Sequence, residues 1–366
     1  MRSMRKLLDL LGIDIPVIQA PMAGASSAEL VAAVSNAGGL GSYGCSRLSP
    51  AQVIEEGQRI RALTNRSFNL GFFCHDAPDV TPEQERAWRS RLAPYYGELG
   101  VDPAGVSAPN RAPFNAEICA AVVSVGPKVA SFHFGLPVPG LVESLKKAGC
   151  VIISSATTVA EAKRLVELGC DAVVAQGLEA GGHRGMFLDM DLNTQVGTFA
   201  LVPQIVDAVD VPVIAAGAIT DARGAAAAFA LGADAVQVGT AYLFCPEAKV
   251  NPVHREALQM ARDDGTALTN VFTGRAARSL VNRLVREVGP ISDVAPQFPA
   301  AAGAVQALSD EGSRRGLPDF TPLWAGQAAA LGHRASASDL TRSLSQDAFA
   351  LLRSLAEQAA DVRPTE

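Results

Sequence analysis

The sequence has little charge and few aromatic residues. Only 19% of its 366 residues are charged and 5% are aromatic, and the formal net charge is −6. It contains no dense Lys/Arg cluster interleaved with aromatic residues, and an acidic chain of this kind carries no electrostatic footprint for a polyanion. Nucleic acid is therefore excluded as an expected partner.

Paired cysteines and long apolar runs are also lacking. The six cysteines are widely spaced and form no C-x-x-C pair, so no zinc or thioredoxin-type motif is supported and no metal site is predicted. Residues 1–9 contain Arg2, Arg5 and Lys6 around a short Leu-rich run, which is too short and too charged for a signal peptide or membrane anchor. We expect a cytoplasmic protein that does not associate with membranes and keeps its thiols reduced.

What the sequence does contain is short apolar runs of strand length, most of them followed by an amphipathic segment of helix length. We predict strands at residues 17–22, 39–44, 68–73, 129–134, 151–156, 172–176, 213–216 and 235–238. Continuous apolar character indicates strands that are covered on both faces, as in a parallel sheet wrapped by helices. Eight strand–helix repeats predict an α/β fold, a (β/α)₈ TIM barrel.

Helices are predicted at residues 28–37, 50–62, 116–125, 140–148, 159–168, 200–208 and 222–231. Start signals precede three of them: Ser26/Ser27 before the first, Thr157/Thr158 with Glu161 before the fifth, and Thr220-Asp221 before the seventh. Gly169 and Gly232 end the fifth and seventh as left-handed caps. Two segments interrupt or follow the repeats. We assign 1–75 and 114–248 to the barrel. Residues 76–113 and 249–366 are assigned to a smaller, mostly helical substrate or lid domain over the barrel mouth.

The residues after each strand are expected to form the binding site, because ligands of a TIM barrel bind at the carboxyl ends of its strands. Gly217 follows the seventh strand, and Gly239 and Thr240 follow the eighth. Loops at these two places commonly bind phosphate, since glycine lets backbone N–H groups approach its oxygens. A phosphate-bearing ligand is therefore predicted.

The loop after the sixth strand, residues 176–185, contains four glycines and His183. A histidine presented there is a candidate general base, because its ordinary pKa lies near working pH. His133, at the end of the fourth strand, should face the same cavity as a second catalytic candidate. Its two flanking phenylalanines are equally compatible with a buried core histidine.

These motifs together resemble one family. The motifs are Gln19-Ala20-Pro21-Met22-Ala23-Gly24, Gly38-Gly39-Leu40-Gly41, Asn69 within 68–70, Ser131-Phe132-His133-Phe134-Gly135, Glu179-Ala180-Gly181-Gly182-His183-Arg184-Gly185 and Gln237-Val238-Gly239-Thr240. The sequence resembles the class I nitronate monooxygenases, formerly called 2-nitropropane dioxygenases, over about residues 8–250 and more loosely to Trp324–Gln327. Phe298-Pro299 stands where members of that family carry Tyr-Pro.

The resemblance implies FMN as cofactor and the oxidation of an alkyl nitronate, such as propionate 3-nitronate, by O₂ to a carbonyl compound and nitrite. It implies His183 as the residue that takes the substrate's proton or hydrogen-bonds its nitro group. The implied flavin-binding residues are Ala20, Pro21, Met22, Ala23, Asn69, Gln176, Gly181, Gly182, Gly217, Gln237, Val238, Gly239 and Thr240. A monomer or homodimer is expected.

Two alternatives stay open. An FMN-dependent enoyl-acyl-carrier-protein reductase shares the barrel and a Gly-Gly-His loop, and it would consume NADH or NADPH. A barrel that only stores or senses flavin, or binds no ligand, would make no use of His183.

Overall fold

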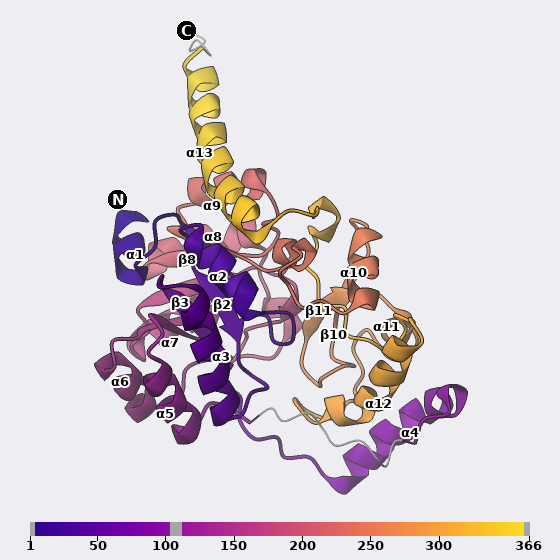
Figure 1. Ribbon diagram of the computed structural model, residues 1–366. Helices are drawn as coiled ribbons and strands as arrows, with labels where there is room; N and C mark the ends of the chain where they lie inside the picture. The colour runs from indigo at the N-terminus through magenta and orange to yellow at the C-terminus, as the bar shows by residue number, and fades with distance from the viewer. Residues whose placement is uncertain (1–3, 103–111, 362–366) are drawn as a thin grey trace.

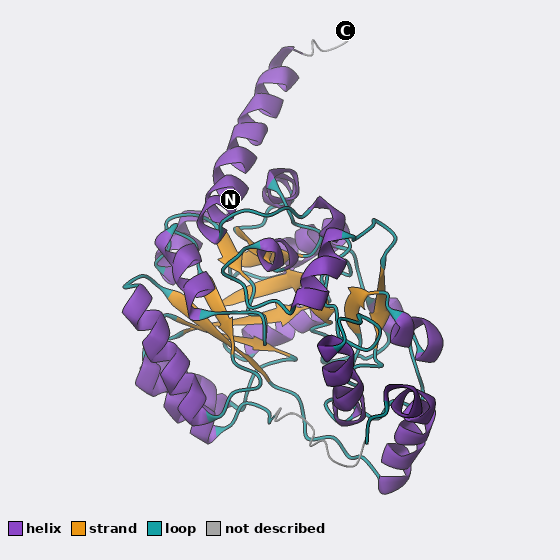
Figure 2. Ribbon diagram, turned by 45° about the vertical axis from the view of Figure 1, so that its right-hand side comes forward, coloured by secondary structure: helices purple, strands orange, loops and turns teal. Residues whose placement is uncertain are grey.

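The structure, a computed structural model, describes residues 4–102 and 112–361. Its main feature is a sheet of eight parallel strands in the order β1-β9-β8-β6-β5-β4-β3-β2. A parallel bridge between Ile18 and Leu40 joins the two ends of this sheet. The predicted TIM barrel is confirmed, and Figure 2 shows its strands surrounded by helices.

The eight strands lie where the apolar runs predict them. They are β1 (Val17–Gln19), β2 (Gly41–Gly44), β3 (Phe68–Phe73), β4 (Val129–His133), β5 (Val151–Ala156), β6 (Ala172–Gln176), β8 (Val213–Ala216) and β9 (Ala235–Val238). The largest difference is at β1, which ends at Gln19 instead of residue 22. The following Ala20–Ala23 segment leaves the sheet and forms a turn at the barrel mouth.

The seven predicted barrel helices are also present, within two residues at each end. They are α2 (Ala28–Asn36), α3 (Pro50–Leu63), α5 (Ala116–Val125), α6 (Pro139–Lys147), α7 (Val159–Glu167), α8 (Thr198–Ala208) and α9 (Ala222–Ala230). Ser27, Thr158 and Asp221 cap α2, α7 and α9 by accepting backbone N–H bonds. Gly169 and Gly232 adopt φ of 93° and 96° just after α7 and α9, so they supply the left-handed conformation that ends these helices.

The barrel interior is filled by strand side chains and closed at its amino-terminal end by α1 (Met4–Leu11). Leu7 and Leu11 of α1 are fully buried and pack with Ile18, Val129 and Ile214 of the strands. Burial of this apolar surface stabilises the barrel and leaves its carboxyl end open for a ligand.

A smaller unit lies beside the mouth of the barrel (Figures 1 and 2). Its helices are α4 (Pro82–Leu99), α10 (Pro252–Gln259), α11 (Arg283–Val288) and α12 (Ala301–Arg314). It also contains an antiparallel sheet of β10 (Thr266–Thr269), β11 (Ala277–Leu280) and β7 (Gly182–His183). The unit is mostly helical, as expected, but the sequence analysis predicts no strand after residue 248, where the structure has β10 and β11. The strands were missed because each has four residues or fewer and mixes polar with apolar side chains.

Helix α4, in the excursion after β3, packs on the outside of this unit. Trp88 donates its indole N–H to the carbonyl of Ala301, 3.1 Å away, and the Tyr96 hydroxyl donates to the carbonyl of Ala304 at 2.6 Å. Residues 103–111 lie outside the described residues. Among the described residues of 76–113, none lines the cavity at the barrel mouth, so α4 supports α12 from behind and does not cover the mouth as a lid.

The last helix, α13 (Ala337–Asp361), differs from the expected arrangement. Its first half packs on the barrel, where Leu340, Leu344 and Ala348 join the core that also contains Leu30 and Val34 of α2. Its second half projects from the body of the molecule (Figure 1). This tail segment therefore belongs with the barrel and not with the smaller unit.

Three short 3₁₀ helices complete the described elements: η2 (Leu192–Thr194), η3 (Thr240–Phe244) and η4 (Ala329–Leu331). Within the described ranges, no helix combines the length and apolar character needed to cross a membrane.

Candidate functional site

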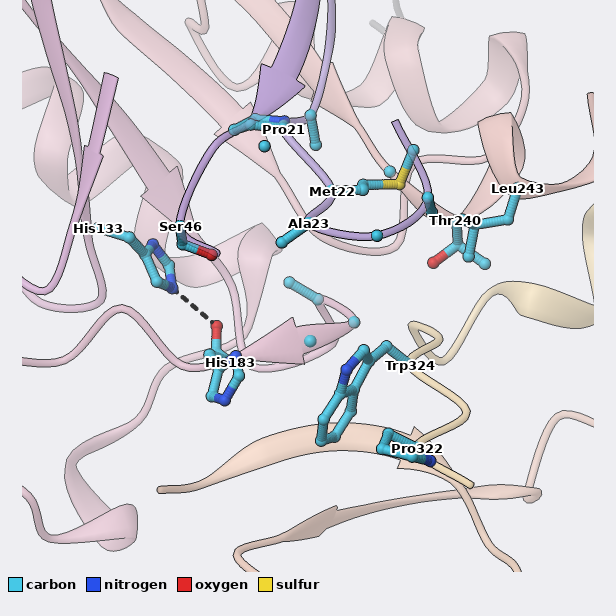
Figure 3. Close-up of a pocket in the computed structure, with 18 of the residues that line it drawn as sticks. Pro21, Met22, Ala23, Ser46, His133, His183, Thr240, Leu243, Pro322 and Trp324 are labelled. Carbon is cyan, nitrogen blue, oxygen red and sulfur yellow. Dashed lines mark hydrogen bonds between the residues drawn. The ribbon is translucent and has the colours of Figure 1, made fainter. Parts of the chain in front are cut away.

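A cavity of about 570 Å³ opens at the carboxyl ends of the barrel strands. All but two of the residues predicted from the sequence line it: Ala20, Pro21, Met22, Ala23, His133, Gln176, Gly181, Gly182, His183, Gly217, Gln237, Gly239 and Thr240. Figure 3 shows Pro21–Ala23 on one side and His183 with Trp324 on the other. Residues far apart in sequence thus share one cavity.

His183 lies on β7, where it pairs with Ala277 of β11. Its Nε2 is 2.9 Å from the hydroxyl of Thr273, a residue that is buried. Four aromatic rings surround the imidazole at centroid distances of 5.3–5.9 Å, those of Phe73, Phe134, Phe298 and Trp324. The Thr273 hydroxyl and the packing of the aromatic rings therefore hold the imidazole in a largely apolar part of the cavity.

His133 supports the loop that carries His183. Its Nε2 donates to the backbone carbonyl of His183 at 3.0 Å, the bond drawn in Figure 3. Its Nδ1 is bonded to the Ser155 hydroxyl. Burial lowers the pKa of His133 to about 4, so the ring is neutral near pH 7. A neutral ring that donates from Nε2 accepts at Nδ1, which makes Ser155 the donor.

The turn at Ala20–Ala23 is seated against two glycines of neighbouring strands. A Cβ on Gly71 would lie 2.5 Å from Cβ of Pro21, and one on Gly44 would lie 2.4 Å from the amide nitrogen of Ala23. No side chain fits in either place, so the turn packs directly on the ends of β2 and β3. Gly44 and Gly71 were not predicted as site residues, because nothing in a sequence shows how closely two segments approach.

The two glycine-containing turns after β8 and β9 line one end of the cavity. Gly217 and Ala218 adopt φ of 115° and 56° in succession, a conformation that turns consecutive backbone N–H groups toward one side. The Thr240 hydroxyl accepts a bond of 3.0 Å from the amide of Gly326, and no hydrogen bond from this hydroxyl to an acceptor is found among the described residues. This end of the cavity has the donors that a phosphate needs.

Asn69 and Val238 lie just beneath the cavity and do not line it. The Val238 carbonyl accepts from the amide of Ala20 at 2.8 Å and so fixes the start of the Ala20–Ala23 turn. The Asn69 amide nitrogen donates to the hydroxyls of Ser42 and Ser131, while its Oδ1 is buried with no partner among the described residues. The Asn69 side chain is therefore held below the cavity by Ser42 and Ser131.

Gln176 and Arg184 shape the loop between β6 and β7. Gln176 donates to the carbonyl of His183 at 2.9 Å and accepts from the amide of Gly185 at 2.8 Å. Arg184 is fully buried and donates to the carbonyls of Gln176 and Gly177. Both side chains hold the backbone that presents His183, and only one amide hydrogen of Gln176 is left for a ligand.

A family model named nitronate monooxygenase matches residues 4–347 of this chain. The chain belongs to the nitronate monooxygenase family. A nitronate monooxygenase of Pseudomonas aeruginosa is 41% identical over 348 residues, which cover 92% of this chain and 97% of the relative. One from Paraburkholderia phytofirmans is 40% identical, over 94% of each chain.

Solved structures agree with this membership in the nitronate monooxygenase family. Nitroalkane oxidase from Streptomyces ansochromogenes superposes with a TM-score of 0.86 at 35% identity, over 95% of this chain and 99% of that one. FabK from Thermotoga maritima superposes with a TM-score of 0.74 at 27% identity, over 98% and 99% of the two chains. The resemblance stated from the sequence motifs is confirmed.

Several residues that contact His183 were not predicted as site residues. Thr273 lies in a loop between two short strands and gives no signal in the sequence. Phe73 ends β3 and Phe134 follows β4, as ordinary apolar residues would. Phe298 and Trp324 are signalled only by the family resemblance, and only the fold brings them against His183.

Proposed function

We propose that the protein oxidises alkyl nitronates, such as propionate 3-nitronate, with O₂ to a carbonyl compound and nitrite, using FMN. The observation that carries this proposal is the placement of His183 in the cavity, opposite the Ala20–Ala23 turn and enclosed by aromatic rings. Membership of the nitronate monooxygenase family supports it.

FMN would supply the electron acceptor for the substrate and the means to reduce O₂. The cavity fits this cofactor at its phosphate end. The Gly217–Ala218 turn and Thr240 suit the phosphate. Ala20–Ala23, Gln176, Gly181 and Gly182 would contact the ring and ribityl chain, while Gln237 to Gly239 would complete the phosphate end.

In this proposal His183 handles the proton. A neutral nitroalkane must lose its α-proton before oxidation, and an imidazole is a suitable base near neutral pH. A nitronate already carries the negative charge, so with this substrate His183 is needed only to hydrogen-bond the nitro group. The surrounding rings exclude water and strengthen that hydrogen bond.

His133 is assigned a positioning role. Both of its ring nitrogens are bonded within the protein, to the His183 carbonyl and to Ser155. It therefore holds the backbone of the residue that handles the proton, and a change at His133 should act through His183.

The test compares His183→Asn with the wild type on a nitroalkane and on its pre-formed nitronate. Asparagine keeps a polar side chain of similar reach but cannot act as a base. We expect both proteins to contain the normal amount of FMN. The wild type should release nitrite and consume O₂ without added nicotinamide. The variant should lose activity, and the loss should be more severe with the nitroalkane than with the nitronate. Equal activity of both proteins on both substrate forms would remove His183 from the mechanism.

The same assay distinguishes the proposed function from that of an enoyl-acyl-carrier-protein reductase. Wild type that is inert with propionate 3-nitronate and alkyl nitronates, but oxidises NADH in the presence of an enoyl thioester, would support the enoyl-acyl-carrier-protein reductase instead.

A further inference from the structure

The entrance of the cavity carries positively charged side chains. Arg47 and Lys249 line the cavity and are at the same time exposed to solvent, so they form part of its rim. Both are next to the turn at Gly24–Ala25. A methyl group on Gly24 would lie 3.7 Å from Nη1 of Arg47, and the amide of Lys249 donates to the carbonyl of Ala25 at 2.9 Å.

The charge of Arg47 is not used within the described part of the chain. No described carboxylate lies within ion-pair distance of its guanidinium, and no described residue accepts a hydrogen bond from it. Lys249 also lacks an ion pair among the described residues, although it acts electrostatically on Glu29, whose nearest ion-pair partner is Arg59 at 3.5 Å.

The opposite rim is formed by α12 and adds little opposing charge. Asp310 is exposed there and accepts a hydrogen bond of 2.7 Å from Gln306. Ser313 accepts a bond of 3.1 Å from Asn251, which ties the two sides of the rim together. The entrance thus presents two cations against one carboxylate, in a chain whose net charge is −6.

We propose that Arg47, assisted by Lys249, makes the entrance select anionic over neutral ligands. This inference rests on the proposed function for its substrate, because a nitronate is an anion and the corresponding nitroalkane is not. A cation at the mouth of a low-dielectric cavity raises the local concentration and association rate of anions, and this effect decreases with ionic strength. The rim would therefore distinguish the two substrate forms before either reaches His183.

The experiment uses the purified holoprotein and measures ligand binding and turnover at low and high salt. The variants are Arg47→Gln, the double variant Arg47→Gln/Lys249→Gln and Arg47→Lys. Arg353→Gln is the matched control, because Arg353 is exposed on the projecting half of α13. The double variant should lower kcat/KM for nitronates about 10-fold at low salt. This decrease in kcat/KM should be small for a neutral nitroalkane and should become smaller at high salt. Arg47→Lys keeps the positive charge and should retain most of the wild-type kcat/KM for nitronates.

Binding of unreactive ligands gives a readout that does not depend on turnover. Trp324 lines the cavity, so its fluorescence can follow binding of propionate and of propionamide, which differ in charge. The proposal expects the double variant to weaken propionate binding about 10-fold and to leave propionamide binding unchanged. Equal losses for both ligands, or an unchanged salt dependence, would overturn it. Wild type that binds propionate through this rim but oxidises no nitronate would reject the proposed function and retain the selective entrance.

Discussion

The hydroxyl of Thr273 lies 2.9 Å from Nε2 of His183 and is a polar partner of its ring. Aromatic packing alone allows an imidazole to rotate about its Cβ–Cγ bond, whereas a hydrogen bond to one ring nitrogen selects one orientation. A buried threonine on the loop between β10 and β11 thus connects the smaller unit to the chemistry at the barrel mouth.

Thr273→Val should therefore lower kcat for nitroalkanes about 10-fold or more, because a small misplacement of a catalytic group is costly. Valine has nearly the same shape, so folding and FMN content should be retained. Thr273→Ser keeps the hydroxyl and should recover most of the activity and the wild-type pH profile of kcat. If serine and valine behave alike, the hydroxyl does not position His183.

Binding of the FMN phosphate, in the proposed site, should depend on Gly217 and on Thr240. Gly217→Val would place Cβ 2.7 Å from the Thr198 hydroxyl at a φ of 115°, and Thr240→Val removes the hydroxyl. Both variants should be isolated folded but largely colourless, as measured by flavin absorbance per polypeptide. Gly140→Val on α6 is the control, because its Cβ would meet nothing within 4 Å. Full yellow colour in both site variants would mean that the phosphate lies elsewhere.

At the scale of elements, α12 is the wall that separates the cavity from α4. Ala302 and Val305 line the cavity, while Ala301, Ala304 and Leu308 pack in the cluster that contains Trp88, Leu92 and Tyr96 of α4. The excursion after β3 thus acts on the site indirectly, through the position of α12.

Trp88→Ala should destabilise the protein by about 3–5 kcal/mol, the usual cost of removing a buried tryptophan. The side chain is 1% exposed and donates to the Ala301 carbonyl, so its loss should also loosen α12 and raise KM for nitronates more than it lowers kcat. Urea denaturation and steady-state kinetics measure the two effects. Trp88→Phe, which keeps most of the volume, should cost much less. Unchanged stability of Trp88→Ala would show that α4 does not support the wall.

At the scale of the whole molecule, two buried histidines link folding to pH. Burial lowers the pKa of both His133 and His254 to about 4, against an ordinary value near 6.5. Between these values the unfolded chain binds more protons than the folded protein. Their contribution to stability is therefore complete above about pH 6.5 and is lost as pH falls toward 4.

The midpoint of thermal unfolding should accordingly decrease as the pH falls from about 7 toward 4, and His133→Gln should make this decrease shallower. His333→Gln changes the same residue type at an exposed position and serves as the control. A decrease that is as steep in His133→Gln as in the control would show that proton uptake at His133 does not contribute to acid destabilisation.

The sequence by itself determined the barrel and the location of its site. Fully buried parallel strands must be continuously apolar, so eight such runs alternating with capped helices identify the fold and nearly all strand bounds. The carboxyl ends of such strands meet at one face of the barrel. Strand order and length alone therefore place Ala20–Ala23, His133, His183, Gly217 and Gly239 around one cavity.

Tertiary structure alone decided what surrounds these residues. The contacts of His183 with Thr273, Phe298 and Trp324 span 90 residues or more, and the pairing of β7 with β11 joins segments of two and four residues whose pattern is too short to predict. The packing of α4 behind α12 and of α13 on the barrel depends on which apolar faces meet. A local stretch of sequence shows the apolar periodicity and the capping residues of an element. Which other element packs against its apolar face is determined only by the packing of the whole chain.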